Sequence, residues 1–337
     1  MQAQSGFAPN PTRIFETFTS FHRSAALKAA VEVDVFSAIA PGEATAQAIA
    51  SRCNASERGI RILCDALVTY GLLEKHGTMY KNTPDTGFFL DRRSPAYMGG
   101  AARFLCHPEH AKSWGNLTQA VRTGTTALTG DGNMKIENEI WVDFAKGMAP
   151  MVVPGAQVIA KLVRTSAQVK VLDIAAGHGM FGITVAQSSP QAQIYALDWP
   201  NVLEVAKEHA EQFGVASRYH TIAGDFFNAE LGSGYGVILL TNFLHHFDRS
   251  TCVQIIAKCK AALAPGGKIA TAEFVPNDDR VSPELPAAFA LAMLAGTVAG
   301  DAYTFPEFQS MFTEAGLPST TRHEIAPGHP QTILISQ

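Results

Sequence analysis

The chain has 337 residues, of which 47% are hydrophobic and 17% charged, so we expect a globular protein long enough for two domains. Its formal net charge of -4 provides no broad cationic surface, which argues against nucleic acid as a partner. Five cysteines with no C-x-x-C pair favour reduced thiols. No signal-peptide pattern and no apolar run of about 18 residues occur, so we expect a cytoplasmic protein with no membrane partner.

The first hundred residues have the pattern of a small helical domain. Residues 12–39 carry apolar side chains at near-helical spacing, which predicts two helices. Residues 45–80 then indicate a helix, a turn at Asn54, a second helix and two short strands, which is the winged-helix pattern. Winged helices often bind DNA, but residues 42–92 balance six basic against six acidic side chains. We therefore predict a packing or dimerisation role, with a ligand-binding transcription regulator as the alternative.

The rest of the chain indicates a second, larger domain. Residues 96–161 predict helices interrupted at Gly, Pro and Thr, with aromatic side chains that could roof a pocket. After residue 168, short apolar strands alternate with helices of ten or more residues, which predicts a mostly parallel sheet with helices on both faces. We expect an α/β, Rossmann-like domain over residues 101–337 that follows the winged-helix domain of residues 1–100.

Three segments at predicted strand ends carry residues suited to a nucleotide-like cofactor. The strand at 169–174 leads into a glycine-rich turn, where Gly177 and Gly179 let backbone N–H groups approach a ligand. Asp198 closes the next strand, nineteen positions after Gly179 (198 − 179 = 19), where a carboxylate can accept ribose hydroxyls. After the third strand, Asp225 can accept an adenine amine while Phe226 packs nearby. The first two features also suit a nicotinamide or flavin dinucleotide.

In this order, the segments resemble the class I methyltransferase fold. Over nearly the whole chain they resemble the small-molecule O-methyltransferases of plant phenylpropanoid and bacterial polyketide pathways. VLDIAAGHG is similar to that family's glycine loop, ALDWPNV to its ribose site and GDFF to its adenine site, although the family usually has glycine where this chain has Ala175. The resemblance implies S-adenosylmethionine as cofactor, S-adenosylhomocysteine as product, and a homodimer formed through the winged-helix domain. The cofactor-binding residues that it implies are Asp173, Ala175, Gly177, Gly179, Asp198, Trp199, Gly224, Asp225, Phe226 and Asn242.

The segment LTNFLHHFD, after the fourth strand, contains the candidate catalytic base. His245 matches the histidine that removes the acceptor's proton in the resembling family, and Glu273 resembles one of two acids that orient it. A neutral imidazole, with a pKa near ~6.5, can accept a proton from a hydroxyl as that oxygen attacks. The second acid has no match, because Ala302 and Tyr303 occupy its place. Methyl transfer by positioning alone therefore stays open.

Four further residues match acceptor-facing positions of the family: Phe144, Met148, Met293 and Thr297. We expect an O-methyltransferase that acts on a hydroxylated, aromatic small molecule. The alternatives are methyl transfer to carbon on the same scaffold and a nicotinamide-dependent dehydrogenase. A metal site at His245, His246 and Glu273 is disfavoured, because adjacent histidines cannot easily face one ion, and we predict no metal ligands.

Overall fold

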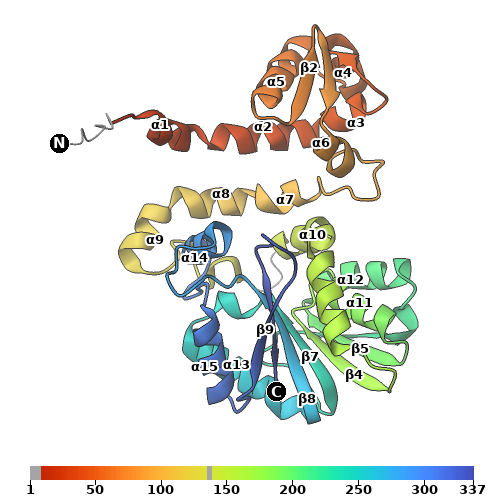
Figure 1. Ribbon diagram of the computed structural model, residues 1–337, viewed down its shortest axis with the longest axis vertical. Coiled ribbons are helices and arrows are strands. Elements are labelled where there is room, and N and C mark those ends of the chain that lie inside the picture. The colour runs from red at the N-terminus through yellow and green to blue at the C-terminus, as the bar shows by residue number, and fades with distance from the viewer. Residues whose placement is uncertain (1–8, 135–138) are drawn as a thin grey trace, which may run out of the picture. The chain divides into compact units, whose positions relative to one another are not determined.

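The computed structural model describes residues 9–134 and 139–337, and these residues form two compact units (Figure 1). The first unit ends at Ala102 and the second begins at Arg103. In the described part of the chain, no helix combines the length and the hydropathy that crossing a bilayer requires.

The first unit is a winged-helix domain with additional helices at its start. Residues 12–39 form three helices rather than the expected two, because the chain turns at Ser20 and again at Asp34, where φ is +63°. The helix-turn-helix and the strands that follow it agree with the prediction, and the three strands pair antiparallel in the order β1-β3-β2. Its elements are α1 (Thr12–Thr19), α2 (Phe21–Glu32), α3 (Val35–Ile39), β1 (Ala44–Thr45), α4 (Ala46–Cys53), α5 (Glu57–Thr69), β2 (Leu73–His76), β3 (Met79–Asn82) and α6 (Pro84–Phe89).

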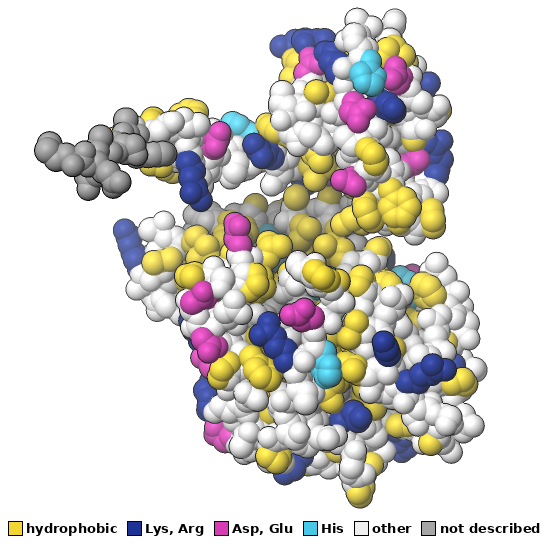
Figure 2. All heavy atoms as spheres, in the orientation of Figure 1, with side chains coloured by type: hydrophobic (Ala, Val, Ile, Leu, Met, Phe, Trp, Pro, Cys, Tyr) yellow, Lys and Arg dark blue, Asp and Glu magenta, His cyan; other side chains and the backbone are white. Residues whose placement is uncertain are grey.

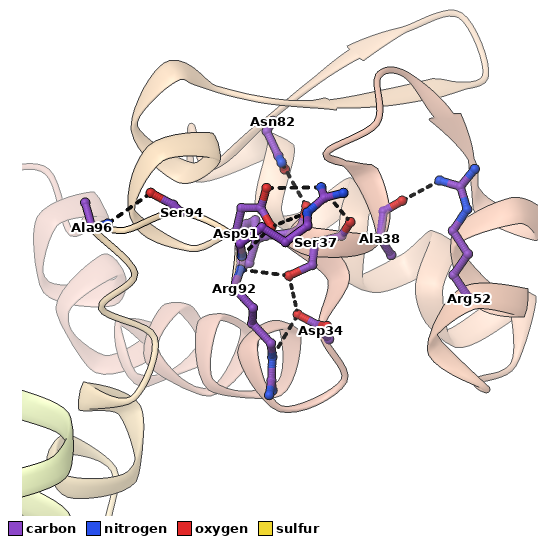
Figure 3. Close-up of polar contacts among 11 residues, drawn as sticks. Asp34, Ser37, Ala38, Arg52, Asn82, Asp91, Arg92, Ser94 and Ala96 are labelled. Carbon is purple, nitrogen blue, oxygen red and sulfur yellow. Dashed lines mark hydrogen bonds and ion pairs between the residues drawn. The ribbon is translucent and has the colours of Figure 1, made fainter. Parts of the chain in front are cut away.

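Polar contacts attach the segment after α6 to the end of α2 and to α3 (Figure 3). The Nε of Arg92 lies 3.0 Å from the carboxylate of Asp34, and its backbone N–H donates to the hydroxyl of Ser37. Asn82, at the end of β3, donates its amide N–H to the carbonyl of Phe36. Side chains thus supply the hydrogen bonds that the short helix α3 and its loops cannot make among themselves.

The second unit is built on a seven-stranded sheet in the order β6-β5-β4-β7-β8-β10-β9. The first five of these strands are parallel, as expected, while β10 is antiparallel to both of its neighbours. The elements before the sheet are α7 (Ala101–Leu105), which spans the boundary, α8 (Pro108–Gly115), α9 (Leu117–Thr123), η1 (Gly132–Met134) and α10 (Ile140–Val163). Those of the sheet domain are β4 (Val169–Ile174), α11 (Met180–Ser188), β5 (Ala192–Asp198), α12 (Pro200–Gln212), η2 (Ala216–Arg218), β6 (Tyr219–Ala223), β7 (Tyr235–Thr241), η3 (Leu244–His246), α13 (Arg249–Ala262), β8 (Leu263–Glu273), α14 (Glu284–Gly296), α15 (Phe305–Glu314), β9 (Thr320–Glu324) and β10 (Thr332–Ser336).

The edge strand β9 was missed by the sequence analysis. Its residues, TTRHE, are polar and mostly exposed, so they lack the apolar run that marks the buried strands. A loop of only seven residues joins β9 to β10, too short for the crossover that a parallel pair requires, and the two strands therefore form a hairpin.

Two apolar cores cover the two faces of the sheet (Figure 1). One is formed with α10, α11 and α12, and the other with α13 and α15. The expectation that prolines interrupt the helices before the sheet is wrong for α10, which continues for 24 residues through Pro150 and Pro154. Burial of its apolar face against the core outweighs the backbone hydrogen bonds that the two prolines remove.

Close packing at the start of α11 gives a stability prediction. Gly182 donates its N–H to the carboxylate of Asp173, and a Cβ at this position would lie 2.7 Å from Cγ2 of Ile194 and 2.9 Å from the carboxylate oxygen. We expect Gly182→Ala to lower the free energy of unfolding by about 1–3 kcal/mol, because β4 or β5 must shift. The control is Gly115→Ala in α8, where nothing lies within 4 Å of the added methyl and stability should not fall. Equal unfolding midpoints in urea for Gly182→Ala and the wild type would contradict this account.

Candidate active site

The carboxyl ends of the five parallel strands bring most of the predicted site residues to one edge of the sheet. The loop after β4 carries the glycines, and β5 ends at Asp198. Residues 224–226 follow β6, residues 242–246 follow β7, and Glu273 is the last residue of β8. Open α/β sheets bind ligands at this edge, because the loops and helix N-termini there present free backbone groups.

The glycine loop has a backbone conformation that only some residues adopt readily. Gly177 and Gly179 have φ of +56° and +74°. A Cβ on Gly179 would lie 2.5 Å from the hydroxyl of Tyr219, so the loop can pass over this ring only with glycine at that position. Ala175 has φ of +51°, a left-handed conformation that costs an alanine about 1–2 kcal/mol, which explains why relatives would favour glycine there.

Asp198 ties the end of β5 to this loop. Its Oδ2 accepts the N–H of Gly177 at 2.7 Å, and its Oδ1 accepts the N–H of Trp199 at 2.7 Å. Burial raises the pKa of Asp198 to about 6, although the two N–H donors favour the charged form. Each oxygen accepts one N–H and so keeps a lone pair for a ligand hydroxyl, and the residue is only partly buried.

Beneath the loop lie polar groups whose burial could not be read from the sequence. Asp173 is fully buried; its Oδ2 accepts the N–H of Gly182, and its Oδ1 has no partner among the described residues. Burial, with a smaller contribution from the nearby Asp198, raises the pKa of Asp173 well above its usual range. His178 is also buried, its ring stacks on Phe144 with centroids 5.7 Å apart, and burial lowers its pKa to about 3.

The segment after β6 presents an open backbone next to a fixed aromatic ring. Gly224 has no atom within 4 Å of the position of a Cβ, so space adjoins it. Asp225 accepts the N–H of Phe227 and the side-chain amide of Asn228, while Phe226 is buried. Lys258, which the sequence analysis missed, donates to the carbonyls of Phe226 and Phe227 at 2.7 and 3.0 Å and so holds this loop from α13.

His245 and Glu273 form a buried pair at the ends of β7 and β8. The Nδ1 of His245 lies 2.5 Å from Oε2 of Glu273, and the other carboxylate oxygen accepts the N–H groups of Phe243 and Leu244 at 3.1 and 2.9 Å. In the part of the chain that the structure describes, Nε2 of His245 bonds to no other residue. The pair therefore leaves one imidazole nitrogen free for a ligand.

Asn242 starts this loop with a positive φ of +53°, and its N–H donates to the carbonyl of Ala272. Its side-chain oxygen accepts the amide N–H of Gln331, a contact from the far end of the sequence. Ala302 and Tyr303, at the positions that match the second acid of the plant enzymes, are both buried. Neither side chain has a carboxylate, and the hydroxyl of Tyr303 donates to the carbonyl of Phe247.

The predicted acceptor residues lie on α10 and at the end of α14, and Phe144 packs against other aromatic rings. One of these rings is that of Trp141, whose indole N–H donates to the carbonyl of Asn133, and Met148 is partly exposed on the same helix. Met293 and Thr297 are buried on α14 and just after it. The Thr297 hydroxyl donates to the carbonyl of Met293 and accepts the N–H of Gly300, so it is already engaged within the protein.

Phe274 and Phe289 contact the ring of His245, and the sequence analysis did not single them out. Their rings stack with centroids 3.9 Å apart, and Phe289 meets the ring of His245 edge-on at 4.9 Å.

Within residues 9–134 and 139–337, no cluster of three His, Cys, Asp or Glu side chains could hold a metal ion.

Comparison with known proteins identifies the chain's family. Residues 114–318 match the model of the O-methyltransferase domain, and residues 15–92 match that of the O-methyltransferase dimerisation domain. The chain belongs to this O-methyltransferase family. It is an enzyme that depends on S-adenosylmethionine and methylates oxygen, not a dehydrogenase or a regulator without catalysis.

Individual relatives agree with this family over nearly their full lengths. The 3-hydroxy-5-methyl-1-naphthoate 3-O-methyltransferase of Streptomyces sahachiroi is 31% identical, with 91% of this chain and 89% of that protein covered. A crystal structure of an O-methyltransferase candidate from Nostoc punctiforme is 48% identical, with a TM-score of 0.94 and coverage of 98% and 99%. Human N-acetylserotonin methyltransferase in complex with S-adenosylmethionine shares the fold, with 22% identity, a TM-score of 0.85 and coverage of 99% of both chains.

Proposed function

We propose that the edge described above binds S-adenosylmethionine beside an aromatic acceptor, and that His245 removes the proton from the acceptor's hydroxyl. The observation that carries this proposal is the pairing of Nδ1 of His245 with a fully buried carboxylate, which leaves Nε2 for the acceptor. Bound S-adenosylmethionine supplies a methyl group on a positively charged sulfur.

The residues at the ends of β4, β5 and β6 fit the adenosyl part of this cofactor. Asp198 has a lone pair on each oxygen for the two ribose hydroxyls, and open space adjoins the backbone of Gly224 for the adenine beside Phe226 and Asp225. Gly177 and the strained Ala175 bring their backbone close to the methionyl part. Trp199 and Asn242 border the same edge, while Asp173 acts from below by holding the first turn of α11.

His245 has the partner that a general base needs. The carboxylate of Glu273 accepts the Nδ1–H and so fixes the tautomer in which Nε2 carries a lone pair. When Nε2 takes the acceptor's hydroxyl proton, the ring becomes an imidazolium that faces this negative charge. The acceptor oxygen then carries the electron pair that forms the new bond to the methyl carbon.

The lining favours a flat aromatic acceptor. Phe274 and Phe289 contact the ring of His245, Trp141 contacts that of His246, and Phe144 packs on Trp141. Met148 and Met293 add polarizable sulfur. The relative from Streptomyces sahachiroi is named for a hydroxynaphthoate, a molecule of this shape. Thr297 supports this lining through its bonds to the end of α14.

We also propose a homodimer that forms through the first unit. Helix α1 has no buried residue, and the side chains of Ile14, Phe15, Phe18 and Phe21 are 63–77% exposed. Hydrophobic side chains are visible on this segment in Figure 2. A contiguous apolar helix face of this kind is covered by another protein surface in most soluble proteins, and a second copy fits the dimerisation domain matched at residues 15–92.

The catalytic pair gives a prediction with two variants. We expect His245→Ala to lower turnover at least ~100-fold without changing S-adenosylhomocysteine affinity. Glu273→Gln should have a similar effect, because an amide N–H facing Nδ1 favours the tautomer with its proton on Nε2. Single-turnover rates and calorimetry check both, with His220→Ala on the exposed side of β6 as control. Full turnover by His245→Ala would leave positioning alone as the mechanism.

The raised pKa of Asp198 predicts how cofactor binding depends on pH. We expect the ribose hydroxyls to donate hydrogen bonds to the ionised carboxylate of Asp198. This carboxylate becomes protonated as the pH falls through about 6. The affinity for S-adenosylhomocysteine should therefore be weaker at about pH 5 than at about pH 8. Asp198→Asn should bind weakly at both values, with little dependence on pH. Calorimetry across this range measures the effect, and a flat wild-type profile would contradict it.

The exposed helix gives a prediction about assembly. The double variant Phe15→Glu, Phe18→Glu should be monomeric in analytical ultracentrifugation, because burying two carboxylates in the interface costs several kcal/mol. Phe213→Glu, the same substitution at an exposed phenylalanine in the second unit, should leave the dimer intact. A monomeric wild type, or a dimeric double variant, would refute the proposed interface.

A further inference from the structure

His246 is a second imidazole beside the proposed base, and the reaction as described above does not use it. It follows His245 in the short helix η3, and the centroids of the two rings are 4.3 Å apart. On its other side, His246 meets the ring of Trp141 edge-on at 5.6 Å. The residue is partly buried, and its contact with Trp141 places the ring beside the proposed acceptor lining.

The two ring nitrogens of His246 differ in their surroundings. Nδ1 is enclosed and has no hydrogen-bond partner among the described residues, whereas Nε2 is not enclosed. Burial, with a smaller contribution from His245, lowers the pKa of His246 well below its usual range, so the ring is neutral. A neutral imidazole carries one N–H and one lone pair. An enclosed N–H without a partner is rarer and costs more free energy than an enclosed lone pair without one. We therefore place the proton of His246 on Nε2.

The other side chains around His245 cannot serve as donors to the acceptor. The indole N–H of Trp141 and the hydroxyl of Thr297 are engaged with backbone carbonyls, and Nε2 of His178 is enclosed. The rings of Phe144, Phe274 and Phe289 are apolar. Among these groups, His246 is the one whose ring contacts that of His245 and whose Nε2 is not enclosed.

We propose that His246 donates its Nε2–H to a second oxygen of the acceptor, adjacent to the hydroxyl that His245 deprotonates. Because the two rings belong to consecutive residues with centroids 4.3 Å apart, they suit two oxygens on neighbouring or peri carbons of one aromatic system. The acceptor class is therefore a vicinal diol, or a phenol with an ortho or peri carbonyl. This inference rests on the proposed function, since it assumes that the acceptor oxygen lies at His245.

The test compares two acceptor probes that differ by one oxygen, 2,3-dihydroxynaphthalene and 2-naphthol. Their dissociation constants are measured on the full-length protein saturated with S-adenosylhomocysteine. We expect the wild type to bind the diol about 10-fold more tightly than 2-naphthol, after correction for the diol's two equivalent hydroxyls. A 10-fold difference in affinity is the contribution of one well-made hydrogen bond. His246→Phe, which keeps a ring against Trp141, should reduce this preference to less than about twofold. His246→Gln keeps an N–H donor and should retain part of it.

The inference is overturned if the wild type shows no preference for the diol, which includes the case in which it binds neither probe. It is also overturned if the preference for the diol survives in His246→Phe. Failure of the inference is distinguishable from failure of the proposed function. If only the inference is wrong, the wild type still binds S-adenosylhomocysteine and methylates 2-naphthol, and His245→Ala still lowers that rate.

Discussion

The arrangement of the reacting centre depends on one buried carboxylate. Glu273 has no exposed surface, and a charge in such a place costs several kcal/mol unless donors surround it. Here two backbone N–H groups from the loop after β7 and the ring of His245 supply those donors. A different path of this loop would take these donors away from the carboxylate. The loop is therefore held in one conformation, and the histidine is oriented with it.

Asp198 uses the same kind of contact for a different purpose. It too accepts two backbone N–H groups, from Gly177 and Trp199, but the residue is only partly buried. Glu273 accepts three hydrogen bonds within the protein and has no exposed surface, whereas Asp198 keeps lone pairs on a partly buried residue. The roles proposed for these two acids, positioning for Glu273 and ligand binding for Asp198, agree with this difference in burial.

Much of this edge could be predicted from the sequence, because parallel strands end on the same side of a sheet. Asp198, Asp225, His245 and Glu273 all follow recognisable apolar strands, so their proximity required only the fold. The predicted winged helix was also confirmed, since its helix caps and turn lie within a short local stretch.

Contacts that depend on distant side chains could not be predicted. The bond between Gln331 and Asn242 joins residues 89 positions apart, through a strand that runs antiparallel to its neighbours. Lys258 lies on a helix whose pattern gave no sign that its amine reaches the loop of Phe226. The burial of Asp173 and His178 likewise follows from the packing of several elements, which no single segment encodes.

Gly300 has a consequence for how this enzyme could acquire new acceptors. A side chain there would run into the carbonyl of His245, and the next residue donates its N–H to the same carbonyl. The segment after α14 is thus fastened to the backbone of the proposed base, so the helix cannot slide without moving the histidine. If the proposed acceptor site is correct, natural or laboratory evolution of substrate range is therefore expected to replace side chains of α14, such as Phe289 and Met293, and not to move the helix.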